Sequence, residues 1–244
     1  AVALARRNGS NFSKALNSRV KDMCEFIMYM TGEGLRPLNI GDSDDRDALK
    51  LNMLEPFSNS AFILNAASVL FNTPGFKIDK NGSDEKSLWL LGHEGYERYS
   101  LLETTYKDKA LASKDFPEGG YYIMRHKGLF LHFDCGKLGY LSLAAHGHAD
   151  SLSFTLSING RQMFIDPGTY LYHSDNKWRD YFRGTSGHNT IRIDGLDQSE
   201  ILGPFLWGYK AKSHLKGWSL NGRFEKVSGY HTGYARLKSP VIHS

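Results

Sequence analysis

The 244-residue sequence has only two cysteines, Cys24 and Cys135, and they lie far apart along the chain. Two cysteines cannot form a disulfide framework, so a small scaffold held together by disulfides is excluded. Cys24 falls in a helical pattern and Cys135 lies near the end of a strand pattern. We therefore expect both thiols to be free and buried.

A long hydrophobic run is also missing. The longest apolar stretch, residues 62–71, has ten residues and contains Asn65. A membrane-spanning helix needs about 20 predominantly apolar residues. The sequence therefore predicts no membrane span.

The sequence also lacks a strong excess of positive or negative charge. Its 30 Lys and Arg residues and 26 Asp and Glu residues give a net charge of +4. This mild excess does not indicate a nucleic-acid-binding protein, and it suits a polyanionic substrate only weakly. The sequence contains no Walker loop and no dinucleotide-binding fingerprint, which excludes the common nucleotide-binding classes. Its 41% hydrophobic and 23% charged residues are typical of a folded globular protein rather than a disordered one.

Residues 1–117 carry helical periodicity. Apolar residues spaced by three and four predict a helix that begins after Ser13, a suitable N-cap, and ends before Gly32. Residues 58–71 are apolar nearly all round and predict a buried second helix, and residues 83–91 predict a short third one. We expect these helices to form the edge of a larger helical assembly.

Residues 118–244 carry strand patterns instead. Residues 152–158 alternate between apolar residues and Ser or Thr, which predicts a half-buried strand with its apolar side facing the core. The following Asn159-Gly160 predicts a two-residue hairpin turn. Several such short strands indicate a β-sandwich or barrel. The expected fold class is α+β, with helices in residues 1–117 and an antiparallel sandwich in residues 118–244.

Two histidines near the middle of the chain are candidates for chemistry. His146 and His148 are two residues apart, so both rings point to one side of an extended backbone. Together with a carboxylate such as Asp166, and with His188 further along, they have the residue types of a metal site with an open coordination position. The alternative is that they are ordinary loop histidines.

Tyrosines and arginines in the same segment allow two interpretations. Tyr170 and Tyr181 offer hydroxyl groups for proton transfer if a nearby cation lowers their pKa from about 10, or they are packing residues of a sandwich. Arg179 and Arg183 match the geometry of carboxylate and sulfate groups, or they only serve solubility. The acidic run at residues 42–47 lacks the spacing of a calcium loop, so we favour a loop that caps the following helix.

Five short motifs follow one another in this part of the chain. They are residues 146–154 (HGHADSLSF), 166–170 (DPGTY), 178–185 (WRDYFRGT), 188–190 (HNT) and 194–200 (DGLDQSE). Their order and spacing over 55 residues resemble the heparinase II/III family of polysaccharide lyases. More loosely, residues 40–45 (IGDSDD) resemble a segment near the end of that family's helical domain.

The resemblance implies an incomplete α/α toroid followed by an antiparallel β-sandwich. Residues 1–117 would be the last toroid helices and residues 118–244 the first part of the sandwich. It also implies cleavage of a glycosidic bond by β-elimination next to a uronic acid. In that reaction a base removes the proton at C5 and an acid protonates the oxygen that leaves C4.

The resemblance also assigns roles by motif. His146 matches a catalytic histidine of the family's sandwich domain, and Tyr170 matches an active-site tyrosine. The residues that match the ligands of a largely structural metal, zinc or another divalent ion, are His148, Asp166 and His188.

Further residues complete the predicted site. We expect Tyr181 to take part in catalysis. The residues expected to contact an acidic polysaccharide, such as heparan sulfate or alginate, are Arg179, Arg183 and Asn189.

Two parts of the family's site have no match in this sequence. The family's main catalytic tyrosine and its carboxylate-neutralising residue belong to earlier toroid helices. The chain also begins at Ala1 without a methionine and ends in a strand-like pattern, so we expect a fragment of a bacterial lyase that is periplasmic or secreted. The alternatives are a frayed natural terminus and, for function, a non-catalytic carbohydrate-binding or scaffold protein on the same fold with a structural metal.

Overall fold

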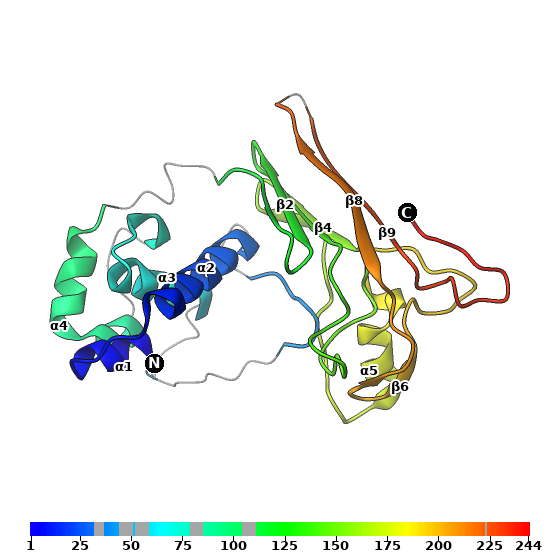
Figure 1. Ribbon diagram of the computed structural model, residues 1–244, viewed down its shortest axis with the longest axis horizontal. Coiled ribbons are helices and arrows are strands. Elements are labelled where there is room, and N and C mark those ends of the chain that lie inside the picture. The colour runs from blue at the N-terminus through cyan, green and yellow to red at the C-terminus, as the bar shows by residue number, and fades with distance from the viewer. Residues whose placement is uncertain (32–36, 44–50, 52–58, 79–84, 104–110, 223) are drawn as a thin grey trace. The chain divides into compact units, whose positions relative to one another are not determined.

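The first of two units is helical. The computed structural model describes residues 1–31, 37–43, 51, 59–78, 85–103, 111–222 and 224–244, and the chain divides into two units (Figure 1). The first unit comprises residues 1–37 and 46–111. Its helices are α1 (Val2–Arg7), α2 (Lys14–Met30), α3 (Asn59–Leu70) and α4 (Glu85–Leu101), with the 3₁₀ helix η2 (Pro74–Phe76) between the last two.

Helix α2 begins where the sequence predicts. The side chain of Ser13 accepts a hydrogen bond from the backbone N–H of Leu16 at 3.2 Å, which satisfies one of the free amides of the first turn. Buried Cys24 and Met28 then join Leu64 of α3 in the core of this unit. The helical spacing therefore identified the helix, but the packed face differs from the predicted one, because Leu16 and Met23 of the predicted face are exposed.

Helix α4 extends beyond the predicted segment 83–91. It continues to Leu101 across a break at Gly92, whose φ of +71° is a left-handed conformation that glycine adopts without steric cost. Because glycine usually weakens a helix, the predicted helix ended just before Gly92. The start of the predicted segment lies in residues 79–84, outside the described residues.

The second unit, residues 38–45 and 112–244, is built mainly from antiparallel strands. The main sheet has five strands in sequential order: β1 (Lys114–Phe116), β2 (Tyr121–His126), β3 (Leu129–Asp134), β4 (Phe154–Ile158) and β5 (Arg161–Phe164). Two hairpins follow, β6 (Ile201–Gly203) with β7 (Leu206–Trp207) and β8 (Ser213–Leu220) with β9 (Glu225–His231). Helix α5 (Asn176–Arg183) and the 3₁₀ helix η3 (Thr185–Gly187) lie between β5 and β6 in the chain.

Local turn chemistry sets the register of the sheet. Asn159 and Gly160 both have positive φ, +48° and +75°, as the tight turn between β4 and β5 requires. Hairpin β8–β9 packs on the main sheet, where the ring centroids of Trp218 and Tyr122 are 5.4 Å apart. The hairpin predicted at Asn159-Gly160 is therefore confirmed.

Strand β4 differs from the prediction in one respect. Its polar residues Thr155 and Ser157 are buried, whereas Leu156 is only half-buried and Ile158 is exposed. Thr155 pairs with buried His132 of β3, so this face of the sheet is a polar interior. Period-2 alternation shows that the two faces differ, but it does not show which face is covered.

The unit boundary lies earlier than the predicted residue 117. Strand β1 precedes that point and pairs with β2, so it belongs to the sheet. Residues 38–45 also belong to the second unit, although residues 46–111 between them and the sheet do not. The fold class, α+β with helices followed by antiparallel sheets, is confirmed.

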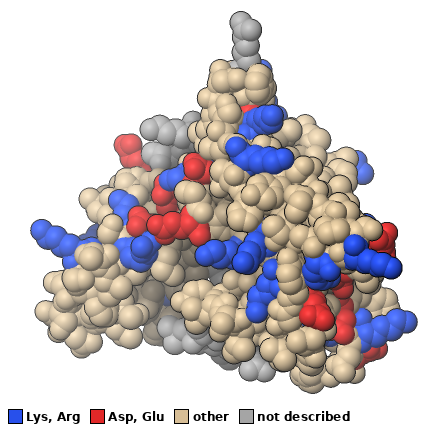
Figure 2. Space-filling view, turned by 45° about the vertical axis from the view of Figure 1, so that its right-hand side comes forward, with Lys and Arg blue, Asp and Glu red and all other residues tan. Residues whose placement is uncertain are grey.

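Three structural observations relate to the composition of the sequence. Cys24 and Cys135 are free and buried, as predicted. None of the described helices has the length and apolarity that a bilayer crossing requires. On the face drawn in Figure 2, basic side chains are interspersed with acidic ones, in line with the small net charge.

Candidate active site and metal centre

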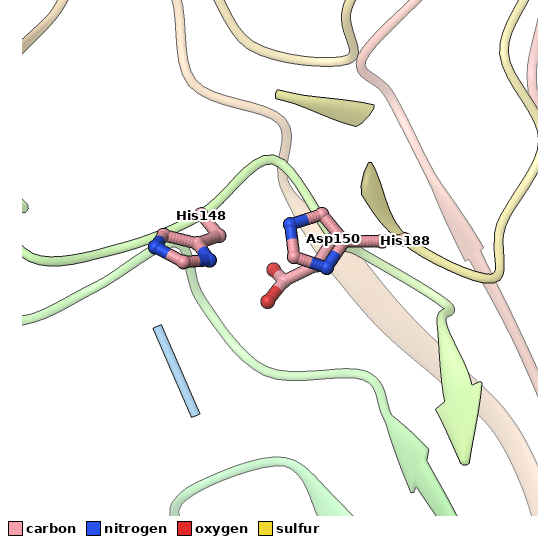
Figure 3. A group of neighbouring side chains, drawn as sticks. All are labelled: His148, Asp150 and His188. Atoms are coloured by element: carbon pink, nitrogen blue, oxygen red, sulfur yellow. The ribbon is translucent and has the colours of Figure 1, made fainter. Parts of the chain in front are cut away.

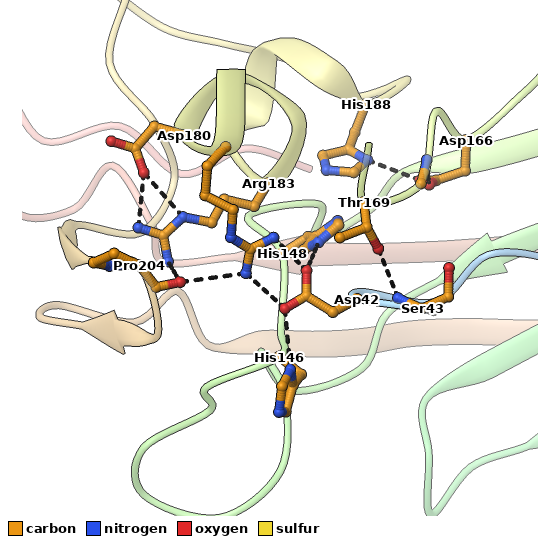
Figure 4. Close-up of polar contacts among 12 residues, drawn as sticks. Asp42, Ser43, His146, His148, Asp166, Thr169, Asp180, Arg183, His188 and Pro204 are labelled. Carbon is orange, nitrogen blue, oxygen red and sulfur yellow. Dashed lines mark hydrogen bonds and ion pairs between the residues drawn. The ribbon is translucent and has the colours of Figure 1, made fainter. Parts of the chain in front are cut away.

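The polar side chains of the second unit meet where its loops converge. They come from residues 38–45, the β3–β4 connection, the turn after β5, helix α5 and the turn after η3 (Figure 4). A rigid sheet that positions functional loops is a common way to bring distant residues together.

Asp42 lies at the centre of this group. Its Oδ2 is 3.1 Å from Nδ1 of His146, and its Oδ1 is 3.0 Å from Nε2 of His148. The guanidinium of Arg179 donates hydrogen bonds to both carboxylate oxygens, with an Nη2–Oδ2 distance of 2.6 Å. The side chains of Asp42, His148 and Arg179 are 0% exposed, whereas that of His146 is 68% exposed. One buried carboxylate therefore holds two histidines and compensates a buried cation.

The environment keeps Asp42 ionised. Burial alone would raise the pKa of Asp42, but hydrogen bonds from His148 and Arg179 and the charge of Arg179 outweigh it and lower the pKa to about 2. An ionised carboxylate only accepts hydrogen bonds, so the proton of a neutral His146 lies on Nδ1. The lone pair of that ring is then on Nε2, the nitrogen that Asp42 does not contact.

Gly41 permits the close approach of this segment to His146. The backbone N–H of Asp42 donates a hydrogen bond to the His146 carbonyl oxygen at 2.9 Å. Gly41 has a φ of +57°, and a Cβ atom at this position would lie 2.3 Å from the same oxygen. Only glycine therefore fits between Asp42 and the chain that it holds.

Replacing Gly41 with alanine is expected to destabilise the protein more than replacing Gly195 with alanine. Both residues have positive φ, +57° and +68°, so each alanine should cost about 1–2 kcal/mol in backbone strain. Only Gly41→Ala also forces a Cβ onto a carbonyl oxygen, since nothing lies within 4 Å of a Cβ at Gly195. Thermal unfolding of both variants measures the difference, and equal losses would contradict the close packing at Gly41.

A second group of buried ligand atoms lies beside Asp42. Figure 3 shows His148, Asp150 and His188 pointing toward one another, and one ligand atom from each lies within 4.8 Å of the others. Nδ1 of His148 and Nε2 of His188 are buried and have no hydrogen-bond partner. Within the described part of the chain, this is the one group of three His, Cys, Asp or Glu side chains with such spacing.

The outer nitrogens of these two histidines are held by carboxylates. Asp42 contacts Nε2 of His148, and Oδ2 of Asp166 lies 2.8 Å from Nδ1 of His188. The other oxygen of Asp166 accepts a hydrogen bond from the Gly168 N–H at 2.9 Å. Carboxylates placed behind histidines in this way fix the ring orientation and the tautomer.

The charge balance of the group favours a cation. Burial raises the pKa of Asp150, and the neighbouring Asp166 carboxylate adds to this effect, although His188 and His148 oppose it. Burial, followed by the charge of Asp150, also raises the pKa of Asp134 well above its ordinary value. Clustered buried carboxylates are costly unless a positive charge compensates them.

Comparisons with known proteins establish the family of this chain. Residues 108–244 match the family described as "Heparinase II/III-like, C-terminal". This chain belongs to the heparinase II/III-like family. The family resemblance predicted from the motifs is therefore confirmed.

Individual relatives of this heparinase II/III-like chain are much longer than it. A heparin-sulfate lyase of Bacteroides thetaiotaomicron is 32% identical over 113 residues, which is 42% of this chain and 16% of the relative. The solved structure of a heparinase III gene product matches 91% of this chain and 30% of its own, with a TM-score of 0.61 and 18% identity. The solved structure of a heparan sulfate lyase from Pedobacter heparinus matches 91% of this chain and 30% of the lyase chain, with a TM-score of 0.60 and 16% identity.

The donor set of this heparinase II/III-like chain fits a divalent metal. Two imidazole nitrogens without partners and a carboxylate oxygen are the atoms that zinc binds in proteins. The structure brings His148 and His188 together as the sequence predicts. The carboxylate beside their free nitrogens is that of Asp150, whereas Asp166 contacts the far side of His188. The ligand role of Asp166 stays a prediction.

Two of the predicted substrate-binding residues require correction. Arg179 and Arg183 are 0% exposed, and Arg183 donates hydrogen bonds to Asp180 and to the carbonyl oxygens of Gly203 and Pro204. Their guanidinium groups are thus engaged inside the protein, where a polysaccharide cannot reach them. Both act as internal cations that hold α5 to its neighbours.

Asn189 also has an internal role in the structure. Its side-chain amide donates hydrogen bonds to the carbonyl oxygens of Phe154 and Ile165, at 3.0 and 2.8 Å. These contacts tie the turn after η3 to the ends of β4 and β5. The side-chain nitrogen of Asn189 is thus used by the sheet, and a contact of Asn189 with substrate stays a prediction.

The predicted catalytic tyrosines pack against aromatic residues that differ from the aromatic neighbours of His146. Tyr170 and Tyr181 pack with Trp178 and Phe182 in an exposed aromatic group. The aromatic neighbours of His146 are instead Tyr172 and Phe205, at centroid distances of 6.4 and 5.6 Å. Among the described residues, His146 is the one predicted catalytic residue that is hydrogen-bonded to Asp42.

Sequence reasoning missed Asp42 and Asp150 as members of the site. Asp42 lies in the acidic run that was assigned to a capping loop, and its signal was the combination of Gly41 with the family-like segment 40–45. The rest of that run, residues 44–47, lies outside the described residues. Asp150 is two residues after His148, inside the same motif, so its position was already marked.

Proposed function

We propose that this chain is part of a longer bacterial polysaccharide lyase that is periplasmic or secreted and cleaves uronic-acid-containing glycans by β-elimination. The observation that carries the proposal is the exposed ring of His146, fixed at Nδ1 by buried Asp42 beside a metal-type ligand group. Its relatives support the proposal, since they carry the names heparin-sulfate lyase and heparan sulfate lyase.

The proposed step needs a base near the C5 proton of the uronic acid and an acid near the oxygen that leaves C4. A base takes the C5 proton, the C5–H electron pair forms the C4=C5 double bond, the C4–O bond breaks and an acid protonates the leaving oxygen. A neutral His146 with its lone pair on exposed Nε2 has the form of a base or, once protonated, of an acid. A positioned group of this kind contributes about 10²–10⁴-fold to the rate.

Tyr170 is the proposed partner hydroxyl contributed by this chain. It adopts a φ of +59°, which is strained for a residue with a side chain, and it is 67% exposed. Strain of this kind concentrates at functional positions, where surrounding structure holds it in place. The adjacent Thr169 anchors the turn, because its Oγ1 accepts a hydrogen bond from the Ser43 N–H at 2.6 Å.

We further propose that the buried group holds zinc or another divalent metal with a mainly structural role. His148 and His188 would supply nitrogen ligands and Asp150 or Asp166 the carboxylate. When bound, the ion would neutralise the clustered carboxylates and fix the loops that carry His146 and Tyr170. The proton transfers themselves remain with the side chains of the protein.

Metal removal is expected to destabilise the protein. A chelator should lower the melting temperature and added zinc should restore it, because a ligand at 100 times its Kd stabilises by about 2.7 kcal/mol. His188→Ala should remove both the bound metal, measured by elemental analysis, and the response to zinc. Exposed His173 provides the control, and His173→Ala should retain both. A wild-type protein that binds no metal and does not respond to zinc would contradict the proposal.

The function is tested with the complete natural protein and a panel of uronic-acid polysaccharides. Cleavage by β-elimination creates a C4=C5 double bond conjugated to the carboxylate, which ultraviolet absorbance detects. The glycan that gives the largest signal identifies the substrate class among heparan sulfate, alginate and other candidates. Binding of a glycan without any unsaturated product would instead support a carbohydrate-binding scaffold with a structural metal.

A further inference from the structure

Helix α5 buries charged side chains and exposes aromatic ones. Its two arginines, Arg179 and Arg183, are 0% exposed, whereas Trp178 is 46% and Tyr181 is 47% exposed. A surface helix normally buries its apolar side and exposes its charges. Buried charges and exposed large apolar groups are the two observations that most often carry functional information.

The inward side of α5 explains why the helix cannot rotate to bury its aromatic residues. Arg179 is paired with Asp42, and Arg183 is bonded to Asp180 and to two backbone carbonyl groups. Turning the helix would separate buried cations from their acceptors, which costs more than covering two aromatic rings would gain. The exposed rings are therefore a fixed feature of this surface.

The exposed rings brace one another. Tyr170 stacks on Phe182 with a centroid distance of 4.8 Å and meets Trp178 edge-on at 6.2 Å. Trp178 also meets Tyr181 edge-on at 5.8 Å. Edge-to-face and offset contacts of this kind stabilise aromatic groups in one arrangement. The aromatic group of Tyr170, Trp178, Tyr181 and Phe182 is thus held in place while much of its surface stays open.

The aromatic group is connected to the proposed active site through neighbouring residues in the chain. Tyr170 belongs to it and ends the turn that begins at Asp166, which is bonded to His188. Trp178 directly precedes Arg179, which is bonded to Asp42. Since the proposed catalytic Tyr170 is itself a member of the aromatic group, a glycan that contacts its hydroxyl lies beside the other rings of the group.

We propose that Trp178, flanked by Tyr170 and Tyr181, is a stacking subsite for one pyranose ring of the glycan substrate. The C–H face of a pyranose is apolar and flat, so it packs on an indole ring while its hydroxyl, carboxylate and sulfate groups stay in water. Three exposed rings match the size of one sugar rather than the larger apolar area of a stable protein interface. The inference rests on the proposed lyase function and adds a binding residue to it.

The test compares three variants of Trp178 in the complete natural protein. Trp178→Ala and Trp178→Leu should raise KM for the best panel glycan about tenfold, the order expected when one ring-stacking contact is lost. Their kcat should change by less than about twofold, because Trp178 has no assigned part in proton transfer. Trp178→Phe should stay close to wild type in KM, since it keeps an aromatic face. Trp89→Ala is the matched control, because Trp89 of α4 is 67% exposed, and its KM should not change.

Each outcome decides between the stacking subsite and another explanation. An unchanged KM in folded Trp178→Ala and Trp178→Leu would overturn the subsite. A KM restored by leucine as well as phenylalanine would do the same, because it would show apolar packing rather than ring stacking. If the wild-type protein cleaves no glycan, the lyase function fails, and affinity electrophoresis with the same glycans tests the subsite separately. Retardation of the wild type that Trp178→Ala removes would support the subsite, and no retardation would overturn it.

Discussion

Replacing Asp42 with alanine is expected to lower the free energy of unfolding by about 3–5 kcal/mol, the range for breaking a buried ion pair. The loss arises because Arg179 would keep its charge in a fully buried position without its carboxylate partner. His146 and His148 would also lose the acceptor that orients them. Chemical denaturation of the variant and the parent protein measures the effect.

Asp180→Ala is the matched control for this prediction. Asp180 also pairs with a buried arginine, but its own side chain is 45% exposed, and Arg183 keeps the carbonyl oxygens of Gly203 and Pro204 as acceptors. Its removal should therefore cost at most about 1 kcal/mol. Similar losses in the two variants would show that Asp42 is an ordinary ion-pair partner rather than the centre of the site.

The contribution of Asp42 also has a defined pH dependence. Its pKa is about 2 in the folded protein, below the value of about 3.9 in an unfolded chain. A depressed carboxyl pKa stabilises the fold fully above the unfolded value, and this stability is lost as the pH falls through the folded value. The difference between the parent protein and Asp42→Ala should therefore be constant above about pH 5 and shrink toward pH 2.

Replacing His146 with alanine is expected to lower kcat of the complete lyase by about 10²–10⁴-fold, the contribution of one positioned acid–base group. Its side chain is 68% exposed, so the melting temperature should change little. His173→Ala, at another exposed histidine of the same unit, should leave kcat unchanged. A near wild-type kcat in His146→Ala would assign the proton transfers to groups elsewhere.

Local signals predicted much of the fold. Helical spacing located α2 and α3, and Asn159-Gly160 located a hairpin, because each depends on residues that are close in the sequence. The order of the motifs likewise predicted that His148 and His188 would meet. These features share one property, which is that the information for them lies within a short segment or in a fixed series of segments.

Features that depend on distant partners were not predicted. The local sequence around an arginine in a polar segment is the same whether the side chain is exposed or buried. The burial of Arg179 depends on its pairing with Asp42, which lies 137 residues away in the sequence. The buried face of β4 depends in the same way on what covers the sheet around His132 and Thr155. Asp42 itself has no local motif beyond Gly41, because its role arises only when His146, His148 and Arg179 reach it.

The second unit is discontinuous in the chain, since residues 38–45 belong to it and residues 46–111 do not. Asp42 lies 104 to 137 residues before the side chains that it binds. When the ribosome has synthesised Asp42, these partners have therefore not yet been synthesised. Contacts of such long sequence separation form late, because the entropy of closing the intervening loop must be overcome first. A gene cut at residue 112 would therefore encode a sheet domain in which Arg179 has lost its counter-ion, and residues 38–45 must be included when this domain is expressed by itself.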